Sequence, residues 1–215
     1  MTNNGRTIKR NFGQVSPLVQ WLSRQLLRRM GWRIAGTFPE DDKLVAIFAP
    51  HTSNWDFVVI YLMVNALGIR GNFFAKHTLC RPPLGWFMRA VGAIPVVRRR
   101  TENLVDSAVS ALAHHERFYL GLAPEGTRRY TDHWRTGFYH IAERADARIL
   151  LLFADYEKKE TGLGPIITPS GDMAADFEMI SAFYADKVPR RPENRSDAVL
   201  GAPRTKSGND EEGTD

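Results

Sequence analysis

The stretch KLVAIFAP, residues 43–50, is followed directly by HTSNWDFVVIYLMVNALG, residues 51–68. The first stretch is short and mostly apolar, which is typical of a buried strand. The second begins with polar residues and continues as an apolar segment that ends near Gly68, as a turn followed by a helix does. A buried strand joined to a helix by a polar turn predicts an α/β fold with functional residues at the strand end.

Short apolar runs alternate with helical periodicity on both sides of this unit. Further strands are expected in residues 32–39, 71–76, 93–99, 117–124 and 148–157, and helices in residues 81–92, 102–116 and 136–146. This alternation predicts one α/β domain, residues 32–188, in which a mixed sheet is flanked by helices. Residues 1–15 are expected to be a flexible lead-in, and residues 189–215 have the composition of a disordered tail.

Composition restricts the class of protein. The 215 residues carry a net charge of +5 and a pI near 9.5, which favours an anionic partner such as nucleic acid, anionic lipid or a phosphorylated substrate. The single cysteine, Cys80, excludes an internal disulfide. The longest strongly apolar stretch, residues 57–67, is shorter than the roughly 20 residues of a membrane span, and the N-terminus lacks the apolar centre of a secretory signal.

Residues 16–31 are predicted to form a basic amphipathic helix. Ser16 is placed as the N-cap and Pro17 at the first helical position. Leucines gather on one broad arc, arginines lie mostly opposite, and Trp21 stands near the border between them. One interpretation is a helix lying in a membrane interface with its arginines on lipid phosphates. The other is a surface helix packed on its own domain, and this pattern alone supports both.

The polar turn after residue 50 contains His51 and Asp56, which can reach each other if the segment curls into a helix start. The aspartate would then fix the imidazole tautomer and leave the other ring nitrogen to remove a proton from a hydroxyl. The alternative is that Asp56 only caps the helix and His51 is a loop residue.

A second turn, PEGTR at residues 124–128, follows the strand predicted in residues 117–124. Gly126 permits a tight turn, and Arg128 offers a planar fork suited to a phosphate. Lys76 and Arg98 stand near the ends of two other predicted strands, so in one sheet they would converge with Arg128 near His51. The alternatives are a solvated turn with an internal Glu–Arg pair and a solvated charge run.

HTSNWD, GAIPVVR and PEGTR, in this order, resemble the motifs of the glycerolipid acyltransferase family that includes 1-acylglycerol-3-phosphate acyltransferases. The resemblance covers roughly residues 32–170. It implies that His51 is the general base and Asp56 its orienting carboxylate. It also implies that Lys76, Arg98, Glu125, Gly126, Thr127 and Arg128 help hold the acceptor phosphate. Glu125 is an anion, so its expected part is to orient a cation or the loop.

The implied reaction moves a fatty acyl group from acyl-CoA or acyl-acyl carrier protein to a hydroxyl of lysophosphatidic acid or a related lysolipid in phospholipid biosynthesis. No cofactor, metal or nucleic-acid partner is expected. The expected partner is an anionic membrane surface, bound peripherally at the cytoplasmic face of the cell membrane. Pro50 and Arg129 depart from residues common in the family, Asn and Ser respectively, and leave the acceptor open.

Four alternatives accompany this interpretation. An acyltransferase for a lyso-aminolipid or glycolipid would keep the same motifs. A catalytically silent membrane- or nucleic-acid-binding protein would bind in a salt-sensitive way that does not depend on His51. Cys80 as a nucleophile and a metal site at His114, His115, Glu116 and His133 are disfavoured, because neither shows the spacing that such chemistry needs.

Overall fold

A seven-stranded sheet forms the centre of the computed structural model, which describes residues 15–83, 85–96 and 101–201. The strand order is β1-β7-β6-β2-β5-β3-β4. The strands are β1 Arg33–Ala35, β2 Lys43–Phe48, β3 Asn72–Lys76, β4 Ala93–Val96, β5 Phe118–Leu122, β6 Arg148–Asp155 and β7 Glu160–Ile167. β7 runs antiparallel to β6, whereas the other neighbouring pairs are parallel. The predicted α/β domain with a mixed sheet is confirmed.

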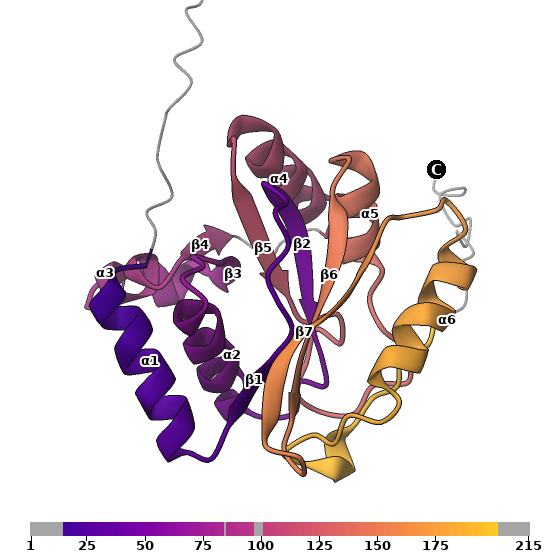
Figure 1. The fold of residues 1–215 in the computed structure, drawn as a ribbon. Helices are drawn as coiled ribbons and strands as arrows, with labels where there is room; N and C mark the ends of the chain where they lie inside the picture. The colour runs from indigo at the N-terminus through magenta and orange to yellow at the C-terminus, as the bar shows by residue number, and fades with distance from the viewer. Residues whose placement is uncertain (1–14, 84, 97–100, 202–215) are drawn as a thin grey trace, which may run out of the picture.

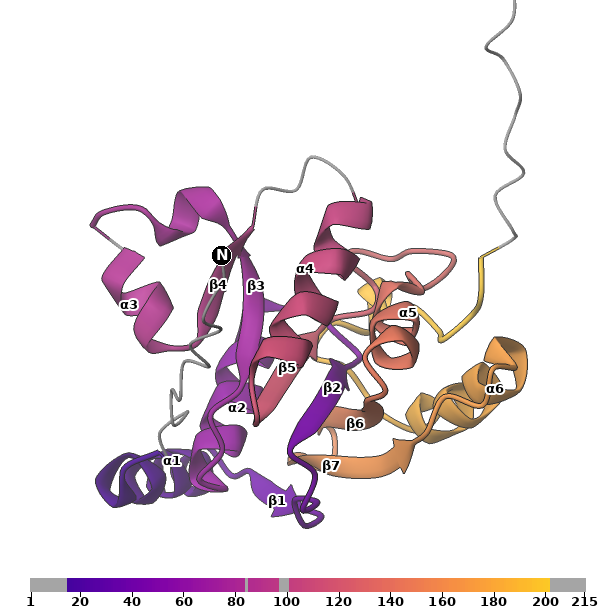
Figure 2. The ribbon, with the colours of Figure 1, turned by 90° about the horizontal axis from the view of Figure 1, so that it is seen from above.

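Helices cover both faces of this sheet (Figures 1 and 2). They are α1 Pro17–Arg29, α2 Asn54–Ala66, α3 Gly85–Ala90, α4 Thr101–His114, α5 Gly137–Arg144 and α6 Met173–Tyr184, with 3-10 turns at His77–Cys80 and Pro192–Asn194. Along β2, Leu44 and Ala46 belong to the core beneath α1 and α2, whereas Val45 and Ile47 belong to the core beneath α4, α5 and α6. The central strand is therefore buried on both faces, as its apolar sequence predicts.

β7 and α6 were not anticipated from the sequence. The β7 segment contains Gly162, Gly164 and Pro165, which weaken the pattern of a strand. Gly162 is needed there because a Cβ atom would lie 2.2 Å from the backbone oxygen of Ala35 in the neighbouring strand β1. α6 begins at the N-cap Asp172, whose carboxylate accepts hydrogen bonds from two backbone N–H groups of the first turn.

Helix α1 forms as predicted, with the Ser16 hydroxyl accepting a hydrogen bond from the backbone N–H of Val19. Leu27 is buried beside α2, and the Arg24 guanidinium donates to the Ala66 carbonyl at the end of that helix. Five large apolar side chains of α1 nevertheless remain exposed, namely Leu18, Val19, Trp21, Leu22 and Leu26. The helix is thus packed on its own domain and still presents an apolar stripe. Among the described residues, no helix has the length and apolarity needed to span a membrane.

The prediction of a disordered tail is wrong for residues 189–201. Ser196 and Ala198 are buried, and the Trp134 indole N–H donates to the Ser196 carbonyl. The Arg195 guanidinium donates to three carbonyls at the end of α6, those of Tyr184, Ala185 and Lys187. The polar composition that suggested disorder instead satisfies backbone groups at a helix end. Residues 202–215 and the predicted lead-in up to residue 14 lie outside the described residues.

Candidate active site

His51 and Asp56 meet in the turn between β2 and α2. The imidazole Nδ1 of His51 lies 3.3 Å from the Asp56 Oδ2 atom, a separation that fits an ion pair although its angles fall short of a hydrogen bond. The Asp56 side chain is fully buried, and the His51 side chain is 20% exposed. Because Nδ1 is itself buried, Nε2 is the ring nitrogen left to meet a substrate.

The Asp56 carboxylate is held by donors on both of its oxygens. Oδ2 accepts from the backbone N–H groups of Thr52 and Ser53, each at 2.7 Å, and Oδ1 accepts from the Tyr156 hydroxyl at 2.8 Å. Asp56 and Ser53 also form the capping box of α2. Helix capping and contact with His51 are therefore not alternatives, because one carboxylate does both.

Glu125, in the PEGTR turn that follows β5, contacts the same loop. Both of its carboxylate oxygens accept from the backbone N–H of His51, at 3.1 and 3.0 Å. The side chain is 3% exposed, and this burial raises its pKa to about 8, with the hydrogen bond from His51 opposing the shift and the charge of Asp56 adding to it. Glu125 thus contacts the loop that carries His51 rather than a cation.

Residues 126–128 of the PEGTR turn are more exposed than Glu125. Gly126 has a positive φ of 67°, a conformation that favours glycine, and the Thr127 hydroxyl accepts from the backbone N–H of Arg129 at 3.2 Å. The Arg128 side chain is exposed and lines a cavity beside His51. It has no ion-pair partner among the residues that the structure describes, so its guanidinium is available to an anionic ligand.

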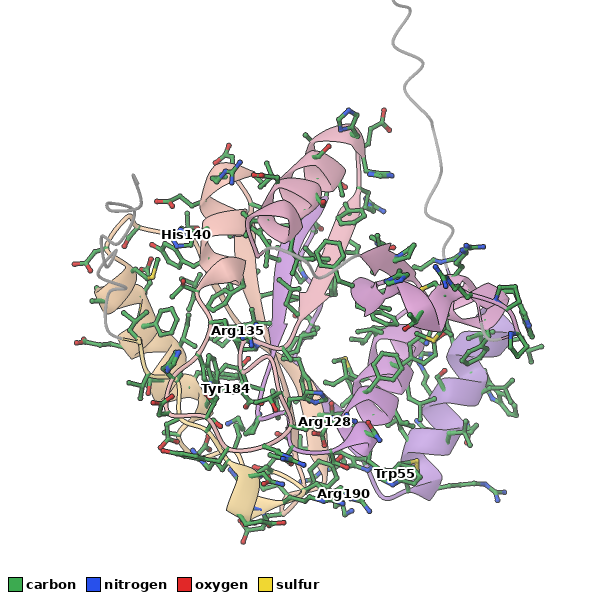
Figure 3. All side chains as sticks on the ribbon, turned by 180° about the vertical axis from the view of Figure 1, so that it is seen from behind. Trp55, Arg128, Arg135, His140, Tyr184 and Arg190 are labelled. Atoms are coloured by element: carbon green, nitrogen blue, oxygen red, sulfur yellow. The ribbon has the colours of Figure 1, made fainter. Side chains whose placement is uncertain are left out.

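Arg135 is a residue that the sequence analysis missed. Its exposed side chain lines the same cavity as Arg128, and Figure 3 shows both on one side of the molecule. A Cβ atom at Gly126 would lie 2.5 Å from the Arg135 Nε, so the missing side chain at Gly126 makes room for this arginine. No carboxylate within residues 15–83, 85–96 and 101–201 forms an ion pair with it. Its position in an irregular loop outside the three motifs left no signal in the sequence.

The two other predicted cations are placed only in part. Lys76 ends β3, which is parallel to β5 and β4, so its backbone lies at the same edge of the sheet as the end of β5. The side chain of Lys76 and the whole of Arg98 lie outside the described residues. Their convergence with Arg128 stays a prediction.

A cavity of about 930 Å³ extends from His51 along the inner side of α2. The α2 wall is mostly apolar and consists of Phe57, Ile60, Tyr61, Val64 and Asn65, and Val19 of α1 also lines the cavity. Residues of β3 and β5 also line the cavity, and these strands pair only through two residue pairs, at Asn72 and Phe73. The cavity lining also includes three arginines, Arg70, Arg128 and Arg135. An apolar wall together with cations suits an amphiphile that has a long apolar part and an anionic head.

Cys80 and two of the histidines considered for a metal site have other contacts in the structure. Cys80 is buried in a small cluster with Ala75 and Ala93. His114 and His115 each direct Nδ1 to a backbone carbonyl of their own helix, at 2.7 Å. Within the described ranges, no group of three or more His, Cys, Asp or Glu side chains is arranged to hold a metal ion.

A family model described as Acyltransferase matches residues 29–152, more than half of the chain, and this range contains all three motifs. The chain belongs to the acyltransferase family. The resemblance drawn from the motifs and the assignment to an acyltransferase enzyme are thereby confirmed at family level.

The fold is similar to the crystal structure of the 1-acyl-sn-glycerophosphate (LPA) acyltransferase PlsC from Thermotoga maritima, with a TM-score of 0.58. The two chains are 14% identical over 79% of this chain and 78% of the other. A comparison with curated protein sequences found no match. At this identity the likeness concerns the fold, so the acceptor and donor have to be argued from the site.

Proposed function

We propose that this acyltransferase transfers a fatty acyl group from acyl-CoA or acyl-acyl carrier protein to a hydroxyl of lysophosphatidic acid or a related lysolipid, in phospholipid biosynthesis. The observation that carries this proposal is the His51–Asp56 pair beside an apolar cavity that is also lined by unpaired arginines. The pair supplies a base, the cavity supplies a surface for the acyl chain, and the arginines supply a site for phosphate.

In this mechanism His51 Nε2 removes the proton of the acceptor hydroxyl while that oxygen attacks the thioester carbonyl. Asp56 stabilises the imidazolium that forms. When the tetrahedral intermediate collapses, the carbon–sulfur bond breaks, and the proton on His51 passes to the leaving thiolate. The acyl group moves directly to the acceptor, so no acyl-enzyme is formed. General-base catalysis of this kind contributes about 10²- to 10⁴-fold to the rate.

The substrates can be assigned to different parts of the cavity. The acyl chain is proposed to lie against the apolar wall of α2, in the space between that helix and the sheet. The acceptor phosphate is proposed to bind Arg128 and Arg135, because guanidinium groups form paired hydrogen bonds with phosphate oxygens. Lys76 and Arg98 remain expected contributors through the family resemblance.

Membrane binding is proposed to occur through α1, peripherally and at the cytoplasmic face of the cell membrane. Its exposed leucines and Trp21 suit the boundary between headgroups and acyl chains, and Arg28 and Arg29 in its last turn suit anionic lipid. Ser16 and Val19, at the start of this helix, line the cavity. A lipid substrate therefore has a short path from the membrane to the site.

The direct test is acyl transfer by the purified protein on liposomes, with lysophosphatidic acid and either acyl-CoA or acyl-acyl carrier protein. We expect phosphatidic acid formation that falls at least about 100-fold in His51→Ala. His140→Ala, which removes an exposed histidine of α5, is the matched control and should keep full activity. Activity that survives His51→Ala would overturn the base assignment. Turnover only with lyso-aminolipids or glycolipids would change the acceptor, and a folded protein inactive on all of them would overturn the proposed function.

A further inference from the structure

Tyr156 contacts the buried carboxylate from outside the acyltransferase motifs. It directly follows β6, the strand that pairs with β2, and its hydroxyl donates to Asp56 Oδ1 at 2.8 Å. The other Asp56 oxygen receives two backbone N–H groups and faces His51. Among the described residues, Tyr156 is the one side chain that donates a hydrogen bond to Asp56.

The tyrosine hydroxyl is a permanent donor in this position. Burial, together with the hydrogen bond to Asp56 and the negative charge of that residue, raises the pKa of Tyr156 far above its ordinary value. These effects favour the protonated phenol, the form that donates to Asp56, although the nearby Arg190 guanidinium lowers the pKa. A carboxylate fixed at Oδ1 by this donor cannot rotate without losing a charge-assisted hydrogen bond, so Oδ2 stays directed at His51.

A segment near the C-terminal end of the described chain holds both Tyr156 and the catalytic turn. The backbone N–H of Tyr156 donates to the Val188 carbonyl at 2.9 Å, and the backbone N–H of Arg191 donates to the Thr52 hydroxyl at 3.2 Å. Between these contacts, the Arg190 guanidinium lies 5.3 Å from the Trp55 ring centroid and 5.9 Å from that of Tyr156. Figure 3 shows Arg190 and Trp55 side by side.

We infer that Tyr156 is a positioning residue for the His51–Asp56 pair, and that residues 188–191 fasten it to the turn. This inference rests on the proposed function, because it takes His51 as the base. Both Tyr156 and residues 188–191 lie beyond residues 29–152, the range that the family model matches. The pair therefore depends on a part of the chain that its motifs do not include.

The test compares Tyr156→Phe with Tyr139→Phe. Tyr139 is a matched control because its hydroxyl also donates to an aspartate, Asp176, at 2.6 Å, but between α5 and α6; Tyr139 is buried and Tyr156 is half-buried. We expect Tyr156→Phe to lower kcat about tenfold with little change in KM, since one hydrogen bond to a charged group is lost. Tyr139→Phe should lower stability and leave kcat unchanged.

The second readout is the NMR signal of the His51 imidazole, assigned with His51→Ala. Loss of the Tyr156 hydroxyl frees Asp56 Oδ1, so the position of the carboxylate against the ring changes, and the signal should move in Tyr156→Phe but not in Tyr139→Phe. Arg190→Ala, which leaves every hydroxyl in place and removes a guanidinium beside the Tyr156 ring, should move the signal by less and serves if Tyr156→Phe fails to fold.

The two proposals fail in different ways. If the wild type is active, and folded Tyr156→Phe keeps the wild-type kcat and the wild-type His51 signal, the positioning role alone is overturned. A wild-type enzyme with no acyl transfer would overturn the proposed function. In that case the His51 signal still decides whether Tyr156 positions the pair.

Discussion

The turn that carries His51 and Asp56 and the arginines beside it lie near the same strand ends, yet they are held in opposite ways. Asp56 and Glu125 are 0% and 3% exposed, and both accept hydrogen bonds from backbone N–H groups of the turn. Arg128 and Arg135 are exposed and have no ion-pair partner among the described residues. The carboxylates of the turn are thus held by hydrogen bonds before substrate binds. The two arginines have no such partner, so bound substrate would be what orders them.

This difference predicts separate consequences for substitutions in the two regions. A fixed polar group contributes mainly in the transition state, because it needs no rearrangement when charge develops. An exposed arginine contributes mainly to substrate affinity, and water screens part of that contribution. Changes in the turn should therefore affect kcat and stability, and changes among the arginines should affect KM.

The largest effect is expected for Glu125→Gln, and it concerns stability. The folded pKa of Glu125, about 8, is above the ordinary value of 4.5. The stability that protonated Glu125 contributes is therefore fully present below pH 4.5 and is lost as the pH rises through 8. The glutamine stays neutral and still offers an oxygen to the His51 N–H. We expect the variant to resist urea better than the wild type at pH 8.5, by on the order of a few kcal/mol.

Urea unfolding at pH 5.5, 7 and 8.5 measures this prediction. Glu157→Gln is the control, because Glu157 is exposed, and it should keep the wild-type dependence on pH. If Glu125→Gln and wild type lose stability in parallel as the pH rises, Glu125 is ionised like a surface carboxylate. The claim that burial in the turn keeps Glu125 protonated would then be wrong.

The parts of the site whose residues are close together in the chain could be predicted from the sequence. The apolar run of β2 and the helical pattern after it place His51 and Asp56 in one turn, where five residues of separation allow contact. The turn after β5 was likewise predicted at the strand end, because residues that end neighbouring parallel strands meet at one edge of the sheet.

The missed features depend on contacts between distant parts of the chain. Tyr156 reaches Asp56 across 100 residues, and Arg191 reaches Thr52 across 139. Arg135 can lie where it does because Gly126 has no side chain, and the sequence does not show that these two residues are in contact. Local patterns predict elements and turns, whereas the hydrogen bonds that orient a side chain come from packing, which a single sequence does not display.

The next largest effect is expected for the exposed arginines. Arg128→Ala and Arg135→Ala should each raise KM for lysophosphatidic acid about tenfold, with kcat little changed, because each removes a guanidinium–phosphate contact. Arg129→Ala is the control, since Arg129 is exposed but does not line the cavity. A monoacylglycerol acceptor and an acyl thioester without the phosphates of coenzyme A identify which substrate carries the phosphate that matters.

These substrates distinguish whether the arginines bind the phosphate of the acceptor or that of the donor. If the arginines bind the acceptor, their loss should have no effect with monoacylglycerol and full effect with lysophosphatidic acid. If they bind the donor, the effect should vanish with the phosphate-free thioester. A fall in kcat with unchanged KM for all substrates would show that these arginines act in the chemical step, and the division between fixed and open regions would not hold.

The smallest effect is expected at the open surface of α1. Leu22 and Leu26 are exposed and do not line the cavity, so replacing both by serine should weaken binding to anionic vesicles several-fold while kcat on a soluble short-chain substrate stays unchanged. Co-sedimentation measures the binding. Met179→Ser removes an equally exposed apolar side chain from α6 and should bind as wild type. Equal losses in both variants would mean that apolar exposure in general, rather than α1, attracts the vesicle. Loss in the α1 variant alone would place the membrane beside the helix whose first residues line the cavity, and would explain why this apolar stripe is exposed.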